Sequence, residues 1–173
     1  TMAAAFVEAG IALDVPDGAQ GIEELAVEFT RLFLCPGPHI SPHESVQGAP
    51  PGCPPQLWSI RTAAVKRFYE STGLSIDGST FIPDHVSIEF EFMSRLIERE
   101  GQARREGDVA MAQEYVKAER KFMTEHLGAW FPAFAEKTTA AARMPFYRQA
   151  AEFAGDFLEK EMGHVKRGGE NGT

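Results

Sequence analysis

The chain is poor in cysteine, in positive charge and in long apolar runs. Its two cysteines, Cys35 and Cys53, are too few for a disulfide framework, which excludes a disulfide-stapled secreted fold and fits a reducing compartment. The 17 Lys and Arg residues are outnumbered by 25 Asp and Glu residues, so at a net charge of −8 we expect no nucleic-acid partner. Apolar runs such as residues 32–34 are too short to span a bilayer, so we expect a cytoplasmic protein without stable membrane insertion.

The sequence also lacks the short motifs of several enzyme classes. It contains no GxxxxGK[ST] phosphate loop, no GxGxxG turn, no GxSxG nucleophile elbow and no CxxC pair. Phosphate-cradling, hydrolase and thioredoxin-type redox sites therefore have no support from motifs. We expect a protein that is not an enzyme and has no catalytic residues.

What the sequence does contain is apolar content with helical periodicity. It is 43% hydrophobic and includes 13 Phe, which is enough for the core of one domain over residues 1–173. Several windows repeat apolar residues at i, i+3, i+4 and i+7, and none alternates with period two. We predict an all-α fold, a single-domain helical bundle of about six to seven helices. The expected helices cover residues 21–34, 55–72, 84–106, 108–127, 130–142 and 145–162.

Capping residues mark several ends of these helices. Asp84 and Asp108 are expected to cap helix N-termini, and Gly107 and Gly163 to end helices. Residues 163–173 are expected to form a frayed tail. The apolar stripes expected to face the core include Leu57, Ile60, Ala64, Val65 and Phe68 in one helix, and Phe146, Ala150, Phe153, Ala154, Phe157 and Leu158 in the last. In the helix that begins at Asp84 the expected stripe is Val86, Phe90, Met93 and Ile97, with Phe92 and Leu96 widening it.

A Pro/Gly-rich loop covers residues 35–55, which hold seven prolines and three glycines in 21 residues. Such a stretch is not expected to be regular helix, and loops of this length are often functional. Cys35, His39, His43 and Cys53 supply zinc-ligand types, but the spacing C-x3-H-x3-H-x9-C lacks two close pairs around a folded spacer. We therefore expect no metal, and we keep a zinc-dependent interaction module as an alternative.

The glutamates of the middle helices and the Asp84-His85 dipeptide are candidates for a functional site. Glu89, Glu119 and their neighbours lack the Glu-x-x-His spacing of a dimetal bundle, so we expect these carboxylates on a solvated face. Asp84 and His85 are adjacent in sequence, and neighbours at a helix start point about 100° apart, so adjacency does not make a catalytic dyad. From the residues alone a helix cap, a partner contact and a catalytic pair all stay open for this dipeptide.

Four blocks in order resemble the TorD/DmsD family of helical chaperones that assist the maturation of molybdenum-containing oxidoreductases. The blocks are RLFLCPGPHISPHESV (31–46), PDHVSIEFEFM (83–93), HLGAWFPAF (126–134) and PFYRQAAEFAGDFL (145–158). They look like that family's Leu-Phe and Ser-Pro segment, its Asp-His helix start, its His-Leu-x-x-Trp block and its Phe-Tyr-initiated last helix. Together they extend over most of the chain.

The resemblance implies a cytoplasmic chaperone without chemistry of its own. Members of that family bind the twin-arginine signal peptide of a molybdopterin oxidoreductase precursor, or its apo catalytic subunit, which assists cofactor insertion and prevents premature export. A leader with a basic head and an apolar stretch would fit carboxylates beside an apolar groove. The implied partner is this precursor subunit, the protein is expected as a monomer or homodimer, and no cofactor is expected apart from a guanine nucleotide reported for some members.

The resemblance also assigns the family's binding positions to individual residues of this chain. The signal-peptide or partner-binding residues it implies are Phe29, Leu32, Phe33, Pro42, His43, Asp84 and His85. Leu32 and Phe33 also fit an ordinary core stripe, and His43 departs from the family pattern because relatives carry an aromatic residue there. Asp84 would be the natural contact for an arginine.

Two further alternatives remain beside the zinc module. The first is a NarJ-type chaperone, whose client needs no exported leader and is held by its enzyme body. The second, from a different class, is a helical nucleotide-hydrolysing enzyme that uses Asp84 and His85. The missing phosphate loop counts against the second.

Overall fold

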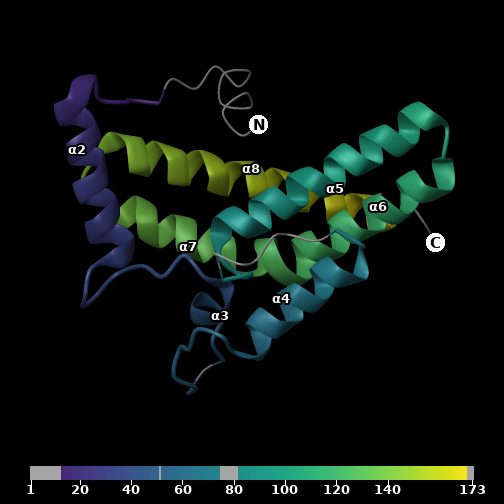
Figure 1. The fold of residues 1–173 in the computed structure, drawn as a ribbon, viewed down its shortest axis with the longest axis horizontal. Coiled ribbons are helices and arrows are strands. Elements are labelled where there is room, and N and C mark those ends of the chain that lie inside the picture. The colour runs from purple at the N-terminus through teal and green to yellow at the C-terminus, as the bar shows by residue number, and fades with distance from the viewer. Residues whose placement is uncertain (1–12, 51, 75–81, 171–173) are drawn as a thin grey trace. The chain divides into compact units, whose positions relative to one another are not determined.

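The structure is a computed structural model that describes residues 13–50, 52–74 and 82–170, with side chains described up to residue 163. Within these ranges the regular elements are helices, and the one strand-like pairing is an isolated antiparallel bridge between His43 and His85. The predicted all-α fold is confirmed (Figure 1). None of the helices within these ranges has the length and apolarity needed to cross a membrane.

Seven α-helices and two π-helical turns make up the helical elements of the described residues. The α-helices are α2 (Gly18–Phe29), α3 (Glu44–Gln47), α4 (Ile60–Ser71), α5 (Val86–Glu106), α6 (Val109–Phe122), α7 (Gly128–Ala141) and α8 (Pro145–Glu170). The π-helical turns Thr30–Leu34 and Met123–Leu127 continue α2 and α6.

The chain divides into two compact units. Unit 1 contains the described residues of Thr1–Ser41 and Pro132–Lys160, and unit 2 contains those of Pro42–Phe131 and Glu161–Thr173. Each unit is described by itself below. The single domain expected from chain length stays a prediction.

The core of unit 1 joins α2 and its π turn to α7 and α8. Leu32 is buried, and the Phe33 ring stacks against Phe134 with centroids 5.9 Å apart. Tyr147 meets the Phe33 ring edge-on at 6.2 Å, and its hydroxyl donates a hydrogen bond to the Leu25 carbonyl at 2.9 Å. The Leu-Phe pair therefore packs the unit 1 core, and Tyr147 fixes the start of α8 to α2.

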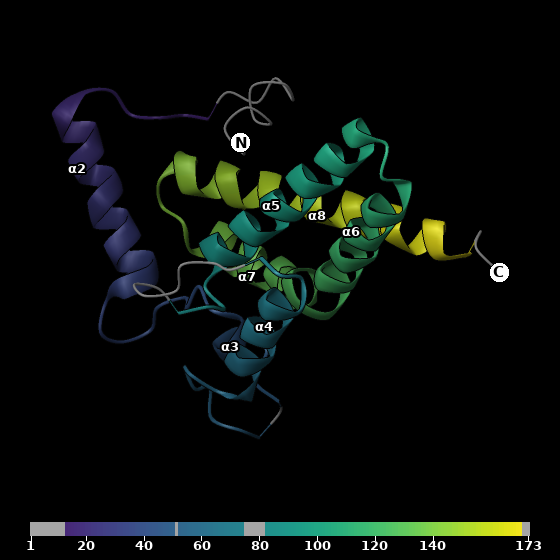
Figure 2. The same cartoon turned by 45° about the vertical axis from the view of Figure 1, so that its right-hand side comes forward.

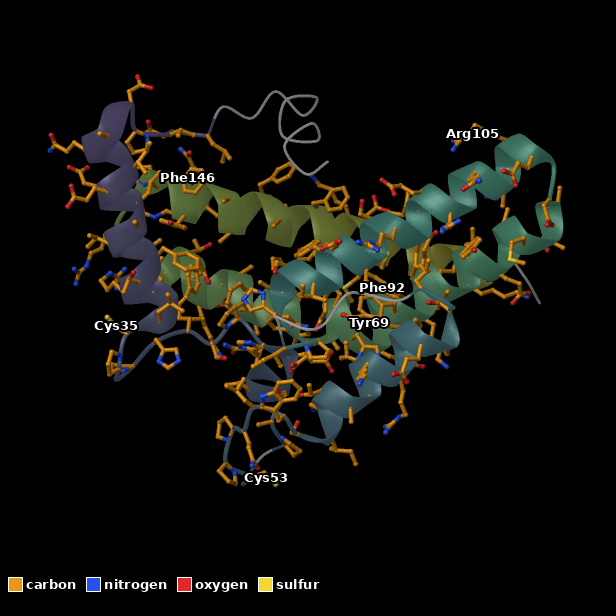
Figure 3. All side chains as sticks on the ribbon, in the orientation of Figure 1. Cys35, Cys53, Tyr69, Phe92, Arg105 and Phe146 are labelled. Carbon is orange, nitrogen blue, oxygen red and sulfur yellow. The ribbon has the colours of Figure 1, made fainter. Side chains whose placement is uncertain are left out.

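The core of unit 2 is an aromatic cluster centred on Phe92 of α5. The Phe92 ring is fully buried, with its centroid 4.3 Å from that of Tyr69 on α4 and 4.8 Å from that of Phe122 on α6 (Figure 3). Phe68 joins the cluster at 5.3 Å from Phe122. Helices α4, α5 and α6 lie next to one another in two views of the molecule (Figures 1 and 2).

Helix α4 begins later than predicted and buries a different face. The adjacent prolines Pro54 and Pro55 lie before the helix. Its N-terminal cap is Ser59, whose hydroxyl accepts a hydrogen bond from the Arg61 N–H at 3.2 Å. Ile60 was expected in the core but is 81% exposed. It lies about 140° around the helix from Val65, which is buried, so the two cannot share one face.

Helix α5 buries Phe92, Met93 and Leu96 of the predicted stripe but not all of it. Its buried apolar face is Ile88, Phe92, Met93 and Leu96, whereas Ile97 is exposed. The aromatic rings of α4 and α6 pack on the side of α5 that carries Phe92, so this side of the helix is the one that is buried. The prediction for the end of α5 is confirmed: Gly107 adopts a left-handed φ of 78°, which glycine takes at no steric cost.

The remaining helix predictions agree in position, with some different ends. Asp108 caps α6 as predicted, since its Oδ1 accepts a hydrogen bond from the Met111 N–H at 2.9 Å. Helix α8 continues to Glu170, so Gly163 does not end it. A glycine inside a helix costs about 1 kcal/mol but blocks nothing, and Gly163 is absent from the described residues with positive φ. Residues 171–173 of the expected frayed tail lie outside the described residues.

The Pro/Gly-rich loop contains one turn of helix, α3, that the composition did not predict. It occupies Glu44–Gln47, within the longest stretch of the loop that holds no proline. Proline density excludes helix only where the prolines fall, because proline removes a donor and clashes with the preceding turn.

Candidate functional site

Residues 42–45 and residues 84–86 are paired along their backbones in unit 2. The Glu44 N–H donates to the Asp84 carbonyl at 3.0 Å, and the Val86 N–H donates to the Pro42 carbonyl at 2.9 Å. His43 and His85 face each other across this bridge. The structure therefore brings together Pro42, His43, Asp84 and His85, four of the residues singled out from the sequence.

Asp84 does not cap α5, contrary to the prediction. His85 is the cap of that helix, and its Nδ1 accepts a hydrogen bond from the Ser87 N–H at 3.2 Å. The Asp84 side chain turns instead to α3, where its Oδ2 accepts a hydrogen bond from the Ser45 N–H at 2.8 Å. It satisfies a free N–H of a helix that lies 39 residues earlier in the chain.

Asp84 is also 0% exposed. Its second oxygen, Oδ1, is buried and has no hydrogen-bond partner among the described residues. Because Asp84 is fully buried in this structure, the arginine contact that the resemblance implied stays a prediction. Its place at the backbone pairing makes it a residue that positions the loop.

The two histidines at the bridge form a compact pair. Their ring centroids are 5.0 Å apart in an edge-to-face arrangement, and both residues are half-buried. Burial lowers the pKa of His43, and the neighbouring His85 lowers it further, against the opposing effect of Asp84. Burial also lowers the pKa of His85. The pair is therefore neutral at neutral pH and offers polar, aromatic surface rather than charge.

Behind the bridge lies a buried polar cluster that sequence reasoning missed. Glu44 of α3 is buried, and its Oε2 lies 3.0 Å from the Nδ1 of His126. Arg61 reaches Glu44 Oε1 at 3.5 Å from the surface side. Glu89 of α5 accepts a hydrogen bond from the indole N–H of Trp130 at 2.9 Å. Trp130 was expected in the core and is buried there, and the hydrogen bond is its additional role.

Glu89 corrects the expectation of a solvated acidic face. It is 0% exposed, and burial together with the neighbouring carboxylates of Glu44 and Asp84 raises its pKa well above the usual range, despite the Trp130 hydrogen bond. Burial and the neighbouring carboxylates therefore favour the protonated form of Glu89. The sequence did carry a signal, since Glu89 stands three and four residues before Phe92 and Met93, on the buried stripe.

Glu119 of α6 is a second exception to that acidic face. One of its oxygens is buried without a hydrogen-bond partner among the described residues. Burial and the nearby Glu100 raise its pKa to about 7, against the opposing charges of Arg104 and Arg120. Neither this carboxylate nor the others gathers into a metal site: no group of three or more His, Cys, Asp or Glu side chains in the described residues could hold a metal ion.

The three unit 1 residues singled out from the sequence differ in exposure. Leu32 is 1% exposed and belongs to the core, and Phe33 is half-buried between Phe134 and Tyr147. Phe29 is 42% exposed and meets the Phe33 ring at 5.2 Å. Only Phe29 therefore presents much apolar surface to a partner.

Glu28 holds α2 to the connection between α7 and α8. Its two carboxylate oxygens accept hydrogen bonds from the Arg31 guanidinium at 2.7 Å each, and one of them also accepts from the Arg143 N–H at 2.7 Å. Arg31 donates a further hydrogen bond to the Ala141 carbonyl at 2.7 Å. The Arg31 hydrogen bonds, aided by the Arg143 N–H, lower the pKa of Glu28 to about 2 against the effect of burial.

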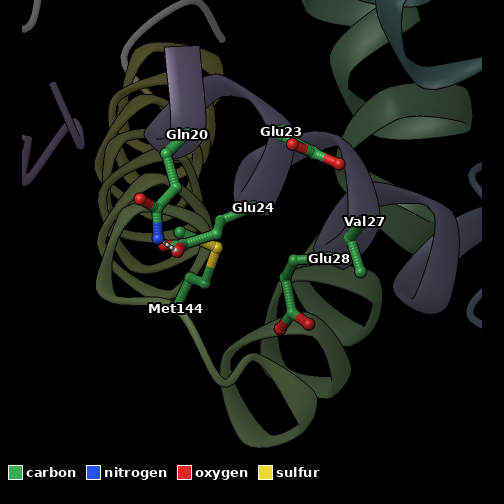
Figure 4. Close-up of a pocket in the computed structure, with 6 residues that line it drawn as sticks. All are labelled: Gln20, Glu23, Glu24, Val27, Glu28 and Met144. Carbon is green, nitrogen blue, oxygen red and sulfur yellow. Dashed lines mark hydrogen bonds between the residues drawn. The ribbon is translucent and has the colours of Figure 1, made fainter. Parts of the chain in front are cut away.

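Beside Glu28 an acidic groove opens in unit 1 (Figure 4). It encloses about 470 Å³ between α2 and the start of α8. Its walls are formed by Gln20, Glu23, Glu24, Val27, Glu28 and Met144. Glu23 and Glu24 are exposed, and Gln20 donates a hydrogen bond to Glu24 at 3.1 Å. The groove thus combines exposed carboxylates with two apolar side chains, and sequence reasoning did not identify it.

Comparison with known proteins finds a matching family and relatives that are named as chaperones. The sequence profile of the family described as nitrate reductase delta subunit matches residues 2–136. The chaperone protein TorD of Vibrio cholerae serotype O1 is 28% identical over 143 residues, which cover 80% of this chain and 60% of that protein.

Other relatives carry assembly-chaperone names. The selenate reductase assembly chaperone protein of Thauera selenatis is 35% identical over 106 residues, covering 60% of this chain and 51% of that protein. The perchlorate reductase assembly chaperone protein of Dechloromonas aromatica is 28% identical over 99 residues, covering 57% of this chain and 43% of that protein. These names are those of chaperones and not of enzymes, and the chain spans 60% or less of the length of each of these relatives. The chain belongs to the nitrate reductase delta subunit family, which includes the TorD-like chaperones that its sequence resembles.

Proposed function

We propose that this protein is a non-catalytic assembly chaperone for a molybdopterin-containing oxidoreductase, and that it binds the basic, apolar leader of the catalytic subunit in the cytoplasm before export. The observation that carries the leader-binding part is the acidic groove on α2. Relatives named for selenate and perchlorate reductases support the class of client. By holding the leader, the protein would delay export while the cofactor is inserted.

The groove has the chemistry that such a leader requires. Glu23 and Glu24 are exposed carboxylates, whereas Glu28 is already bound by Arg31 and by the chain itself. Two arginine side chains can therefore pair with Glu23 and Glu24 without breaking the fold. Val27 and Met144 give apolar surface beside these carboxylates for the stretch that follows the arginines.

The residues implied by the family resemblance take different parts in this proposal. Phe29 lies on the same helix as the groove and offers exposed ring surface to the leader. Pro42, His43 and His85 form a half-buried polar surface in unit 2 that is a second candidate contact. The buried residues Leu32 and Asp84 and the half-buried Phe33 would act by shaping the surfaces around them.

No cofactor is required for this role. The sequence has no phosphate loop, and we propose that guanine nucleotide is neither needed for leader binding nor hydrolysed. Turnover of GTP by the purified protein would favour the enzyme alternative instead.

The proposal is tested by titrating the protein with a fluorescent synthetic peptide that has an arginine pair followed by an apolar stretch. We expect saturable binding to the wild type. Reversing both groove charges with Glu23→Lys and Glu24→Lys should weaken binding at least about tenfold, which corresponds to about 1.4 kcal/mol. The measurement is fluorescence anisotropy at fixed ionic strength.

The matched control reverses two exposed carboxylates outside the groove, with Glu98→Lys and Glu125→Lys. It changes net charge equally, so it separates a local contact from the general attraction of a basic peptide to an acidic protein. Equal weakening by both pairs of substitutions would contradict the groove. Equal binding of a peptide with scrambled apolar residues would contradict leader recognition.

A second candidate is a chaperone that holds the enzyme body of a client without an exported leader. The observation that favours it is the match to the family that carries the description nitrate reductase delta subunit. Co-purification with a leaderless client, together with no binding of the leader peptide, would favour this candidate over the first.

A further inference from the structure

A second groove lies in unit 2, between α4 and α6, which are neighbours in Figures 1 and 2. It encloses about 470 Å³, a size typical of ligand pockets. The lining residues that give it its character are Phe68 of α4 and Met111, Glu114, Tyr115, Lys117 and Lys121 of α6.

The floor of this groove is apolar and fixed in place. The Phe68 ring packs against Phe92, Phe122 and His126, with centroid distances of 6.0, 5.3 and 5.5 Å. These partners belong to the buried aromatic cluster, so Phe68 cannot turn outward to fill the groove. Met111 is 46% exposed on the opposite wall and adds a flexible apolar side chain.

The rim of the groove is basic. Lys117 and Lys121 stand one helical turn apart on α6. The Lys121 Nζ lies 5.9 Å from the centre of the Phe68 ring, and Lys121 forms no ion pair within the part of the chain that the structure describes. Lys117 pairs with Glu114 at 2.6 Å, but both side chains are well exposed and such pairs are weak, so a ligand carboxylate can replace Glu114.

The two lysines and the hydroxyl of Tyr115 are the side-chain donors that face a ligand here. The hydroxyls of Ser71 and Thr72 also line the groove, but they donate to the carbonyls of Phe68 and Tyr69 at 2.7 and 2.8 Å. A positive rim is unusual on a chain of net charge −8 and selects an acidic ligand. Because Glu114 shares this rim, it repels densely charged polyanions and favours single carboxylates.

We propose that the groove between α4 and α6 binds an acidic, amphipathic peptide segment of a partner protein. An aromatic or large aliphatic side chain of the segment packs on Phe68 and Met111, and its neighbouring carboxylates pair with Lys117 and Lys121. This site goes beyond leader binding, because a leader with a basic head is repelled by the same lysines.

The test uses wild-type protein labelled with ¹³C at its methionine methyl groups and follows Met111 by NMR. The probe is the acetylated, amidated peptide Asp-Leu-Phe-Glu, and the comparison probe is its neutral form Asn-Leu-Phe-Gln. We expect a saturable shift of the Met111 signal with the acidic peptide and at least about tenfold weaker binding of the neutral one. Met144, which lines the groove on α2, should not shift.

The variant with Lys117→Glu and Lys121→Glu should lose binding at least about tenfold. Its matched control reverses two exposed lysines outside the groove, with Lys66→Glu and Lys160→Glu, and should bind like the wild type. The buried methyl signals of Met93 and Met123 report whether each variant is folded, and the milder pair Lys117→Gln and Lys121→Gln replaces any variant that is not.

Three outcomes would overturn the proposal. They are an unmoved Met111 signal, equal affinity for the acidic and neutral peptides, and a Met111 shift that depends on protein concentration without peptide. The last would show that a second copy of the chain occupies the groove. Binding of the leader peptide does not enter this test, so either proposal can fail alone.

Discussion

Glu28 on α2 and Glu89 on α5 are both buried glutamates, one in each compact unit. Glu28 accepts two hydrogen bonds from a guanidinium and one from a backbone N–H, and its pKa falls to about 2. Glu89 accepts one hydrogen bond from a neutral indole and lies near other carboxylates, and its pKa rises well above the usual range. The surroundings of Glu28 therefore favour its anion, whereas those of Glu89 favour its protonated form.

The difference shows that burial alone does not decide the charge of a carboxyl group. The donors around Glu28 replace the water that the carboxylate loses, so the ionised form is favoured. Within the part of the chain that the structure describes, the hydrogen-bond donor to Glu89 is the indole of Trp130, and the charge of Glu44 opposes a second negative charge nearby. The same substitution, Glu to Gln, should therefore have opposite consequences in the two units.

The largest expected effect is that of Glu28→Gln. At pH 7 this change should lower the free energy of unfolding by about 2 to 3 kcal/mol, because the amide cannot accept from Arg31 and the backbone as the carboxylate does. The folded pKa of about 2 lies below the usual 4.5, so the contribution is complete above pH 4.5 and is lost as pH falls toward 2. Urea unfolding at pH 7, 4.5 and 3 measures it.

Glu23→Gln is the control for that prediction, since Glu23 is exposed on the same helix. It should change the free energy of unfolding by less than about 0.5 kcal/mol. A difference between wild type and Glu28→Gln that stays constant down to pH 3 would contradict the assignment of Glu28 as an anion.

An intermediate effect is expected for Asp84→Ala. It removes the acceptor of the Ser45 N–H and should cost about 1 to 2 kcal/mol, as loss of a helix cap does. Amide hydrogen exchange should quicken most at Ser45 in α3, and not at the start of α5, which His85 caps. Faster exchange confined to the start of α5 would restore the reading of Asp84 as the cap of its own helix.

The smallest effect is expected for Glu89→Gln. Because the folded pKa of Glu89 lies above 4.5, the protonated form is favoured at pH 4.5, and glutamine keeps an acceptor for Trp130, so the cost there should be below about 1 kcal/mol. Above pH 4.5 the folded wild type retains a proton that the unfolded chain has released, so wild-type stability falls with rising pH. The variant should therefore gain stability relative to the wild type as the pH rises above 4.5.

Glu91→Gln, an exposed position on the same helix, should show no such pH-dependent gain. A loss of several kcal/mol in Glu89→Gln at pH 7 would mean that Glu89 is ionised in the folded state. That result would remove the contrast with Glu28.

Much of the fold could be predicted from local sequence. The helical periodicity, the Asp108 cap and the Gly107 stop depend on neighbouring residues and agree with the structure. The predictions for Ile60 and Ile97 were wrong because periodicity allows several faces, and the partner helices select one. Gly163 failed as a stop because glycine permits a turn without requiring it.

The candidate site was predicted in part. The structure joins Pro42, His43, Asp84 and His85, but the role of Asp84 differs, and the binding role of all seven residues stays a prediction. Glu44 is distant in sequence from His126, and Glu89 from Trp130, so these two contacts were not accessible to any local pattern. The oligomeric state stays a prediction as well.

The sequence by itself determined the all-α class, most helix positions and the family, because these depend on short-range periodicity and on ordered blocks of residues. The tertiary structure alone decided which glutamates are charged and where Asp84 turns. It also decided which helix faces form an acidic and a basic groove. The physical reason is that the pKa of a carboxyl group and the sign of a groove depend on donors and charges brought near by packing, and these come from distant parts of the chain.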